Sequence, residues 1–125
     1  MIDLGSEMSQ PTFGSELRER RRSAGLSQRE LAKQAHLNFS YISKIENDRI
    51  PPPAADTIVQ LCRILATPPE KMLALVGKLP EQVQQTVSMS VAAQEFLETA
   101  HTMELSEREW HKMVRLLREL RGPRP

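Results

Sequence analysis

Apolar residues recur every three or four positions along most of the chain, and this spacing predicts an all-α protein. Gly25 is expected to end the first helix, and the prolines at 51–53 separate the third helix from the fourth. The predicted helices cover residues 13–24, two segments between 25 and 47, then 54–66, 68–76, a short stretch around 83–87, 91–103 and 106–120.

Residues 25–47 contain two short helical patterns separated by a tight turn. Ser27 and Glu30 have the spacing of a capping box, in which each side chain bonds the backbone N–H of the other residue. Asn38 is a second N-cap candidate. Two capped helices joined by a short turn form a helix-turn-helix, whose second helix lies in the major groove of DNA. The alternative is an ordinary αα-hairpin within a helical bundle.

The residues around this pair resemble the lambda- and 434-type phage repressors, also called the Xre family, over residues 13–75. The matching positions are Leu17, Arg21, Gly25, Leu26, Ser27, Gln28, Leu31, Ala32, Tyr41, Ile42, Ser43, Lys44, Ile45, Glu46, Asn47, Arg49, Pro51 and 61–65. The resemblance implies a five-helix DNA-binding domain. Two positions that are usually Gly in the family differ: His36 or a neighbour must make the turn, and Asp48 follows the third helix. His and Asp tolerate positive φ better than most residues, so we expect both departures to cost stability without breaking the fold.

The resemblance also assigns side chains to DNA, one position at a time. It implies that Gln28 contacts a phosphate, the alternative being an exposed first-turn residue. Ser43 and Arg49 are expected to contact the DNA backbone, and Arg18 and Arg22 are weaker candidates for such contacts. The groove-facing positions of the second helix are occupied by Asn38, Phe39, Ser40 and Lys44.

Four side chains of this helix keep two interpretations each. Lys44 can bond guanine O6 or N7, or a phosphate. Asn38 can contact a base or be occupied as the cap. Phe39 can contact a thymine methyl or pack on the turn. Tyr41 can reach a phosphate or pack inward.

The resemblance further implies a largely buried ion pair between Arg21 and Glu46. Removing one partner of such a pair strands the other charge and costs about 3–5 kcal/mol. We therefore assign both residues to the fold and to the orientation of the second helix, not to base contacts.

The distribution of charge is more informative than its total. The net charge is only +1, which says nothing about nucleic acid. Between Arg18 and Arg49, however, there are eight basic residues and four acidic ones. A local positive excess is expected on a phosphate-binding face, although a solvated face of mixed charge is the alternative.

Several classes of protein are disfavoured by composition. Cys62 is the only cysteine, so no intrachain disulfide can form, and we expect it to be buried. Neither a membrane span nor a secretory signal is predicted, and we expect a cytoplasmic protein. His36, His101 and His111 lack the spacing of a metal site, and no phosphate loop, dinucleotide fingerprint or catalytic triad is present. We therefore expect no metal, no cofactor and no enzymatic activity.

The C-terminal segment is too short to make a large core of its own. Ser106 and Glu109 predict another capping box there. The last helix carries an apolar stripe formed by Trp110, Met113, Val114, Leu117 and Leu120. We expect this stripe to form a homodimer, the alternative being ordinary core. The predicted regions are a disordered tail over 1–12, the DNA-binding domain over 13–78, a helical dimerisation segment over 79–121 and a second tail over 122–125.

We expect a dimeric transcriptional repressor that binds an inverted-repeat operator through residues 38–47. One alternative is an antitoxin that represses its own operon and masks a toxin with the C-terminal stripe. Another follows from a similarity in layout to the DdrO- and ImmR-type repressors, which a partner metalloprotease inactivates by cleavage. The corresponding cleavage region comprises Met103, Glu104, Leu105 and Ser106. A helix bundle that binds only proteins is the remaining alternative.

Overall fold

The computed structural model describes residues 11–123, and every regular element in that range is an α-helix, which confirms the all-α prediction. The helix bounds agree closely with the periodic segments of the sequence. The helices are α2 Phe13–Ser23, α3 Gln28–Ala35, α4 Phe39–Glu46, α5 Ala55–Ile64, α6 Glu70–Val76, α7 Glu81–Ser88, α8 Val91–Met103 and α9 Glu107–Glu119.

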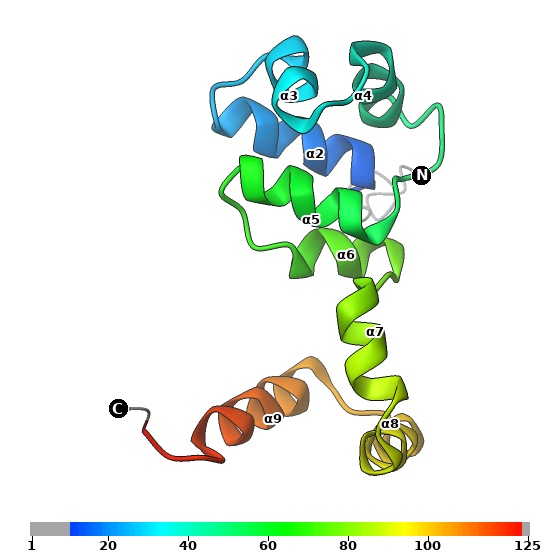
Figure 1. Ribbon diagram of the computed structural model, residues 1–125, viewed down its shortest axis with the longest axis vertical. Helices are drawn as coiled ribbons and strands as arrows, with labels where there is room; N and C mark the ends of the chain where they lie inside the picture. The colour runs from blue at the N-terminus through cyan, green and yellow to red at the C-terminus, as the bar shows by residue number, and fades with distance from the viewer. Residues whose placement is uncertain (1–10, 124–125) are drawn as a thin grey trace, which may run out of the picture. The chain divides into compact units, whose positions relative to one another are not determined.

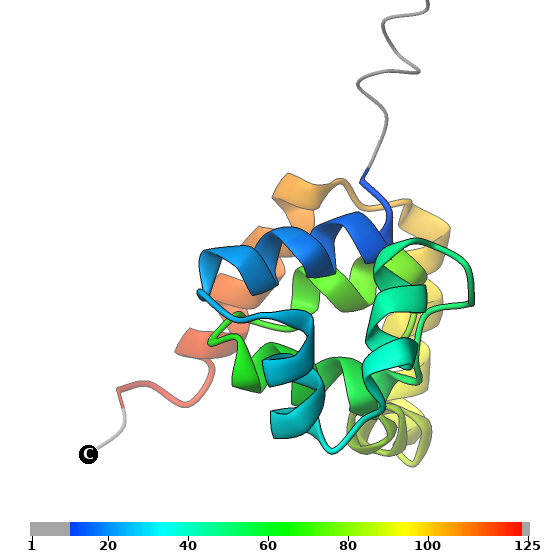
Figure 2. The same ribbon diagram turned by 90° about the horizontal axis from the view of Figure 1, so that it is seen from above.

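The chain divides into two units, the first ending at Val83 and the second beginning at Gln84. In the first unit α2 packs against α4 and α6, α3 packs against α4 and α5, and α5 packs against α6 (Figures 1 and 2). Each helix from α2 to α6 contributes at least one large side chain to a single apolar core. The most deeply buried of these are Leu17, Leu31, Ile42, Ile45, Ile58, Leu61 and Met72. Cys62 is buried among them, as predicted, and burial raises the pKa of its thiol.

Side-chain caps fix where α3 and α4 begin. The capping box of α3 is confirmed: the Glu30 N–H donates to Ser27 Oγ at 3.0 Å, and the Ser27 N–H donates to Glu30 Oε1 at 2.9 Å. Asn38 caps α4, because its Oδ1 accepts the N–H of Ser40 at 3.0 Å. Each cap satisfies backbone donors that the first turn of a helix leaves free.

The predicted N-terminal tail extends one residue too far. Thr12 is the N-cap of α2, since its Oγ1 accepts the N–H of Ser15 at 3.0 Å. Its hydroxyl also donates to Asp48 Oδ2 at 2.9 Å, just beyond α4. The prediction of disorder was therefore wrong at Thr12, because a capping side chain holds the chain in place there. Residues 1–10 of that tail, and 124–125 of the second tail, lie outside the described range.

His36 and Asp48 adopt the left-handed conformation expected at the two positions where the family usually carries Gly. Their φ angles are 55° and 56°. The turn at His36 closes with the Leu37 N–H bonded to the Ala32 carbonyl at 2.8 Å.

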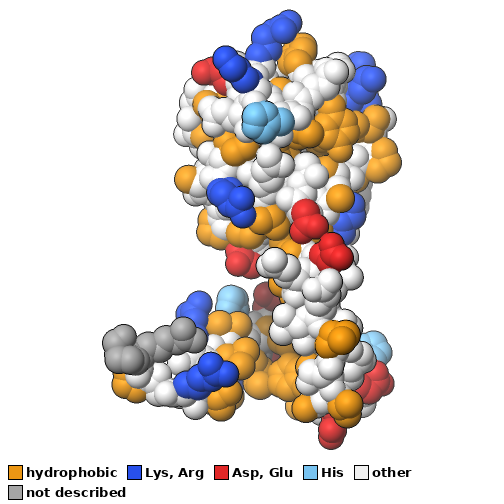
Figure 3. All heavy atoms as spheres, in the orientation of Figure 1, with side chains coloured by type: hydrophobic (Ala, Val, Ile, Leu, Met, Phe, Trp, Pro, Cys, Tyr) orange, Lys and Arg blue, Asp and Glu red, His pale blue; other side chains and the backbone are white. Residues whose placement is uncertain are grey.

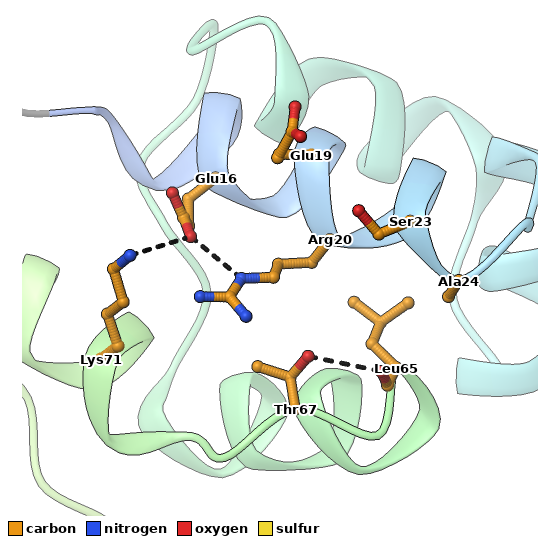
Figure 4. Close-up of a pocket in the computed structure, with 8 residues that line it drawn as sticks. All are labelled: Glu16, Glu19, Arg20, Ser23, Ala24, Leu65, Thr67 and Lys71. Carbon is orange, nitrogen blue, oxygen red and sulfur yellow. Dashed lines mark hydrogen bonds and ion pairs between the residues drawn. The ribbon is translucent and has the colours of Figure 1, made fainter.

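An ion-pair cluster ties α2 to α6 on another face of the first unit. Arg20 Nε donates to the Glu16 carboxylate at 2.9 Å, and Lys71 Nζ lies 3.5 Å from the same carboxylate (Figure 4). Glu16 is buried and, with Arg20 and Lys71, lines a polar hollow, so its two cationic neighbours compensate a charge that would otherwise be costly to bury.

The second unit contains α8 and α9 and buries little. Ser106 and Glu109 form the predicted capping box of α9, with bonds of 3.0 and 3.2 Å. Ala100 is the one hydrophobic residue of this unit that is buried among those described. No helix within residues 11–123 has the length and apolar character needed to cross a membrane.

Candidate nucleic-acid interface

Helix α4 is held at its C-terminal end by a buried ion pair. Arg21 Nε lies 2.6 Å from Glu46 Oε2, and Arg21 Nη2 lies 2.9 Å from Glu46 Oε1. Arg21 is 8% exposed and Glu46 is 2% exposed. A third guanidinium bond, from Arg21 Nη1 to the Leu26 carbonyl at 2.9 Å, fixes the chain just before α3. The pair thus joins α2, the start of α3 and the end of α4.

Glu46 is the centre of a larger cluster of donors. Gln28 Nε2 donates to its Oε1 at 2.9 Å, and Arg18 Nε lies 3.5 Å from the same oxygen. Burial alone would raise the pKa of Glu46, but the bonds from Arg21 and Gln28 and the nearby positive charges hold it below its usual value. The bond with Glu46 in turn raises the pKa of Arg21. The carboxylate is therefore ionised, and three side chains converge on it.

The Glu46 contact changes the interpretation of Gln28. The resemblance implies a phosphate contact for this side chain. In the structure the amide nitrogen already donates one hydrogen to Glu46, which leaves its second hydrogen for any phosphate. The sequence carries no signal for this contact, because it depends on how α3 packs against α4.

Arg18 is committed to the end of α4. Its Nη2 donates to Asn47 Oδ1 at 2.7 Å and to the Glu46 carbonyl at 3.2 Å. Asn47 Nδ2 donates to the Ser43 carbonyl at 2.8 Å. These bonds satisfy carbonyl oxygens that the last turn of a helix leaves without partners. Arg18 therefore acts on the position of α4, and its guanidinium is less available to a phosphate than its exposed neighbour Arg22.

The side chains at the start of α4 are arranged by the cap. Asn38 Oδ1 accepts both the N–H and the hydroxyl of Ser40, at 3.0 and 3.1 Å. The side-chain carbonyl oxygen of Asn38 is therefore occupied by its capping bonds. Lys44 and Arg49 are exposed, and neither side chain forms an ion pair with another described residue.

Phe39 and Tyr41 are both partly buried and pack against the core of the first unit. The guanidinium carbon of Arg29 lies 4.3 Å from the centre of the Phe39 ring, which is the distance of a cation–π contact. Arg29 is not among the residues that the sequence predicts to contact DNA. No sequence rule pairs a residue in the first turn of one helix with the first residue of the next, so this contact appears only in the folded chain.

A basic hollow of about 460 Å³ opens where α3 begins. Its lining combines arginines with polar groups and one aromatic ring: Arg18, Arg21, Arg22, Ser27, Gln28, Arg29 and Phe39. Lys and Arg side chains are visible at the end of the unit formed by α3 and α4 (Figure 3). Free N–H groups at a helix start, the helix dipole and nearby arginines all favour an anion, and the phosphates of a nucleic-acid backbone are such anions.

The C-terminal candidates belong to the second unit. The exposed fractions of Trp110 and Leu117 in α9 and of its C-cap Leu120 are 37%, 65% and 75%, and no residue of that helix is buried. Phe96 and Leu97 of α8 are also exposed, and Figure 3 shows hydrophobic side chains on the surface of this unit. The structure therefore leaves the predicted apolar stripe open to solvent within the described chain.

The four residues of the candidate cleavage region connect α8 to α9. Met103 ends α8, Glu104 follows with a φ of 50°, and Ser106 caps α9. Met103 and Glu104 are exposed and Leu105 is half-buried. Among residues 11–123 no group of three or more His, Cys, Asp or Glu side chains is placed to hold a metal ion.

Comparison with known proteins supplies the family. A family model described as a helix-turn-helix domain matches residues 12–75. An uncharacterized HTH-type transcriptional regulator of Bacillus subtilis, RghRB, is 33% identical over 93 residues, which cover 72% of this chain and 67% of that protein.

Two solved structures are also similar. A hypothetical transcription factor from Neisseria, NHTF, has 27% identity and a TM-score of 0.45, covering 62% of this chain and 81% of that chain. A complex of the SinR and SinI proteins has 19% identity and a TM-score of 0.48, covering 86% of this chain and 95% of that chain. Both TM-scores are modest, and the assignment depends on the sequence matches. The chain belongs to the helix-turn-helix family of DNA-binding transcriptional regulators, of the Xre type.

Proposed function

We propose that this regulator is a homodimeric repressor that binds an inverted-repeat operator. Two copies of α4 would lie in successive major grooves, and occupation of the operator would block a promoter. A two-fold symmetric protein matches a palindromic site, with half-sites about one helical turn apart.

The DNA contacts follow from which side chains remain available. Lys44 and Ser40 contact bases, because both are exposed on α4. Arg49, Ser43, Tyr41 and the second amide hydrogen of Gln28 contact the phosphate backbone. Asn38 contributes chiefly through its cap, which sets the direction in which α4 begins.

The single observation that supports the dimer is the uncovered apolar face of α9. A helical unit in which one described hydrophobic residue is buried gains little stability from its own core. Leu117 and Leu120 expose most of their surface, and a contiguous apolar face of this kind marks an interaction site. A second copy of the same helix offers a self-complementary occupant, as two-fold symmetry requires.

Selection of binding sites from random duplex DNA, with sizing of the protein in solution, tests the proposal. Leu117→Glu places a charge in the apolar face, and Arg115→Gln lowers the net charge by the same amount on the opposite side of α9. We expect the wild-type chain and Arg115→Gln to be dimers that select an inverted repeat. We expect Leu117→Glu to be monomeric and to bind weakly or select a half-site. A promoter carrying the selected site should lose expression when the wild-type chain is present.

Other outcomes would contradict separate parts of the proposal. A Leu117→Glu protein that remains dimeric would place the interface elsewhere. A wild-type chain that stays monomeric but selects a sequence would favour a different protein, such as a toxin, as the occupant of the face. A wild-type chain that selects no sequence would contradict the proposed binding to an operator.

A further inference from the structure

Arg29 and Phe39 form a stacked pair across the turn of the helix-turn-helix. Arg29 is in the first turn of α3 and Phe39 is the first residue of α4. The guanidinium carbon lies 4.3 Å above the ring centre, while the ring itself packs against the core. The ring is thus a fixed platform, and the guanidinium rests on it at the N-terminal end of the recognition helix.

We propose that Arg29, held by Phe39, is a specificity-determining residue that contacts a guanine of each half-site. This inference rests on the proposed operator binding and names the side chain that reads one of its base pairs. The ligand atoms are guanine O6 and N7 in the major groove, which a guanidinium bonds through two parallel N–H groups.

Arg29 is available for such a contact, whereas most neighbouring arginines are not. Arg18 and Arg21 are bonded to the end of α4, and Arg20 is bonded to Glu16. Arg29 is exposed, and its one described partner is the ring of Phe39. A cation–π contact uses the flat face of the guanidinium and leaves the N–H donors at its edge free.

The position of Arg29 and Phe39 favours contact with a DNA base over contact with the phosphate backbone. The N-terminal residues of a recognition helix are the ones that contact base edges. Phe39 has no hydrogen-bonding group, so a polar contact at that point must come from a neighbouring side chain. Stacking also restricts the rotamers of Arg29 before DNA arrives, which reduces the entropy lost on binding.

Arg29 and Phe39 also line the basic hollow, so a phosphate is the competing ligand. The two ligands predict different measurements. A base contact affects one position of the operator. A phosphate contact weakens binding to all sequences alike, and its loss lowers the dependence of affinity on salt by about one ion.

The test measures the affinity of the full chain for the selected operator, for each single-base-pair variant of it, and for unrelated duplex DNA. Arg29→Lys keeps the charge but removes the flat face and the paired donors. Arg22→Lys is the matched control, because Arg22 lines the same hollow and has no aromatic partner among the described residues. Phe39→Leu removes the ring face, and Phe39→Tyr retains it.

We expect Arg29→Lys to reduce discrimination at one G·C pair per half-site by about 5- to 150-fold, the range of a paired guanine contact. Phe39→Leu should reduce discrimination at the same pair, while Phe39→Tyr and Arg22→Lys should preserve it. Arg29 is exposed, so Arg29→Lys tests the inference even if Phe39→Leu fails to fold.

Two results would overturn the inference while leaving operator binding intact. One is unchanged discrimination at every position in Arg29→Lys. The other comes from Arg29→Gln, a further variant that removes the charge: an equal loss of affinity on all duplexes with a reduced salt dependence would identify a phosphate contact. A wild-type chain that selects no sequence would overturn operator binding and this inference together.

Discussion

Arg21 and Glu46 lie on different helices, yet their side chains meet through two charge-assisted hydrogen bonds of 2.6 and 2.9 Å. Such a paired geometry fixes direction as well as distance. Because Glu46 is the last residue of α4, the contact sets the orientation of α4 relative to α2. The pair thus links the packing of the core to the position of the proposed DNA-binding surface.

Replacing Glu46 with Ala should abolish DNA binding through unfolding. The change leaves Arg21 buried without its partner, and we expect a loss of about 3–5 kcal/mol in the free energy of unfolding. Urea denaturation followed by circular dichroism measures this loss. Glu19→Ala, at an exposed position of α2, is the control and should change stability little. A Glu46→Ala protein with an unchanged melting temperature would show that the pair does not hold α4.

The stability of the fold should fall in acid partly through Glu46. Its bonds with Arg21 and Gln28 outweigh burial and lower its pKa in the folded chain, whereas the unfolded chain has the ordinary value of about 4.3. Its contribution to stability is therefore complete above the ordinary value and is lost as the pH falls through the lower folded value.

Melting temperatures of the wild-type chain and Glu46→Gln between pH 7 and pH 3 check this sign. Glu30 and Glu109 also have lowered pKa values, owing to their bonds with Ser27 and Ser106, but both remain in the variant. The gap between the two proteins should be widest at neutral pH and should narrow in acid. A gap that stays constant down to pH 3 would contradict the role of Glu46.

Gly14→Ala should destabilise the domain although Ala is the better helix former. A Cβ on Gly14 would lie 2.9 Å from the Glu46 carbonyl oxygen, 2.6 Å from Asp48 Oδ1 and closer still to the carbonyl oxygen of Ile45. The backbone of α4 must therefore shift, at a cost of about 1–3 kcal/mol. Thermal melting compared with Ser23→Ala, an exposed change in the same helix, isolates the effect. Wild-type stability in Gly14→Ala would mean that α2 and α4 can separate without cost.

Ala66→Gly should stabilise the fold, in contrast to the same substitution elsewhere. Ala66 follows α5 with a φ of 51°, where an L-residue pays about 1–2 kcal/mol that glycine avoids. Glycine also costs about 0.5–1 kcal/mol in backbone entropy. The expected net gain in the free energy of unfolding is therefore about 0.5–1 kcal/mol. Ala74→Gly, at an exposed position inside α6, should instead cost about 1 kcal/mol. Denaturation midpoints that move in the same direction for both variants would contradict this account.

The helices and their starts were predictable because their signals are local. The spacing of Leu31, Ile42, Ile58 and Leu61 follows from helical geometry, and all four are buried. The capping boxes at Ser27 and Ser106 form as predicted, since a cap involves residues three positions apart. The prediction for Thr12 was wrong because a single capping threonine after an aperiodic stretch is too weak a signal.

The sequence by itself determined the helical class, the order of the helices, the caps of α3, α4 and α9, and the membership of the helix-turn-helix family, because these depend on short-range periodicity and on a long motif in register. Tertiary structure alone decided which side chains remain available to DNA. Gln28 and Arg18 are bonded to the end of α4, whereas Arg29 rests on Phe39. Those contacts join residues on different helices, and their geometry exists only once the core has set the angle and distance between α2, α3 and α4.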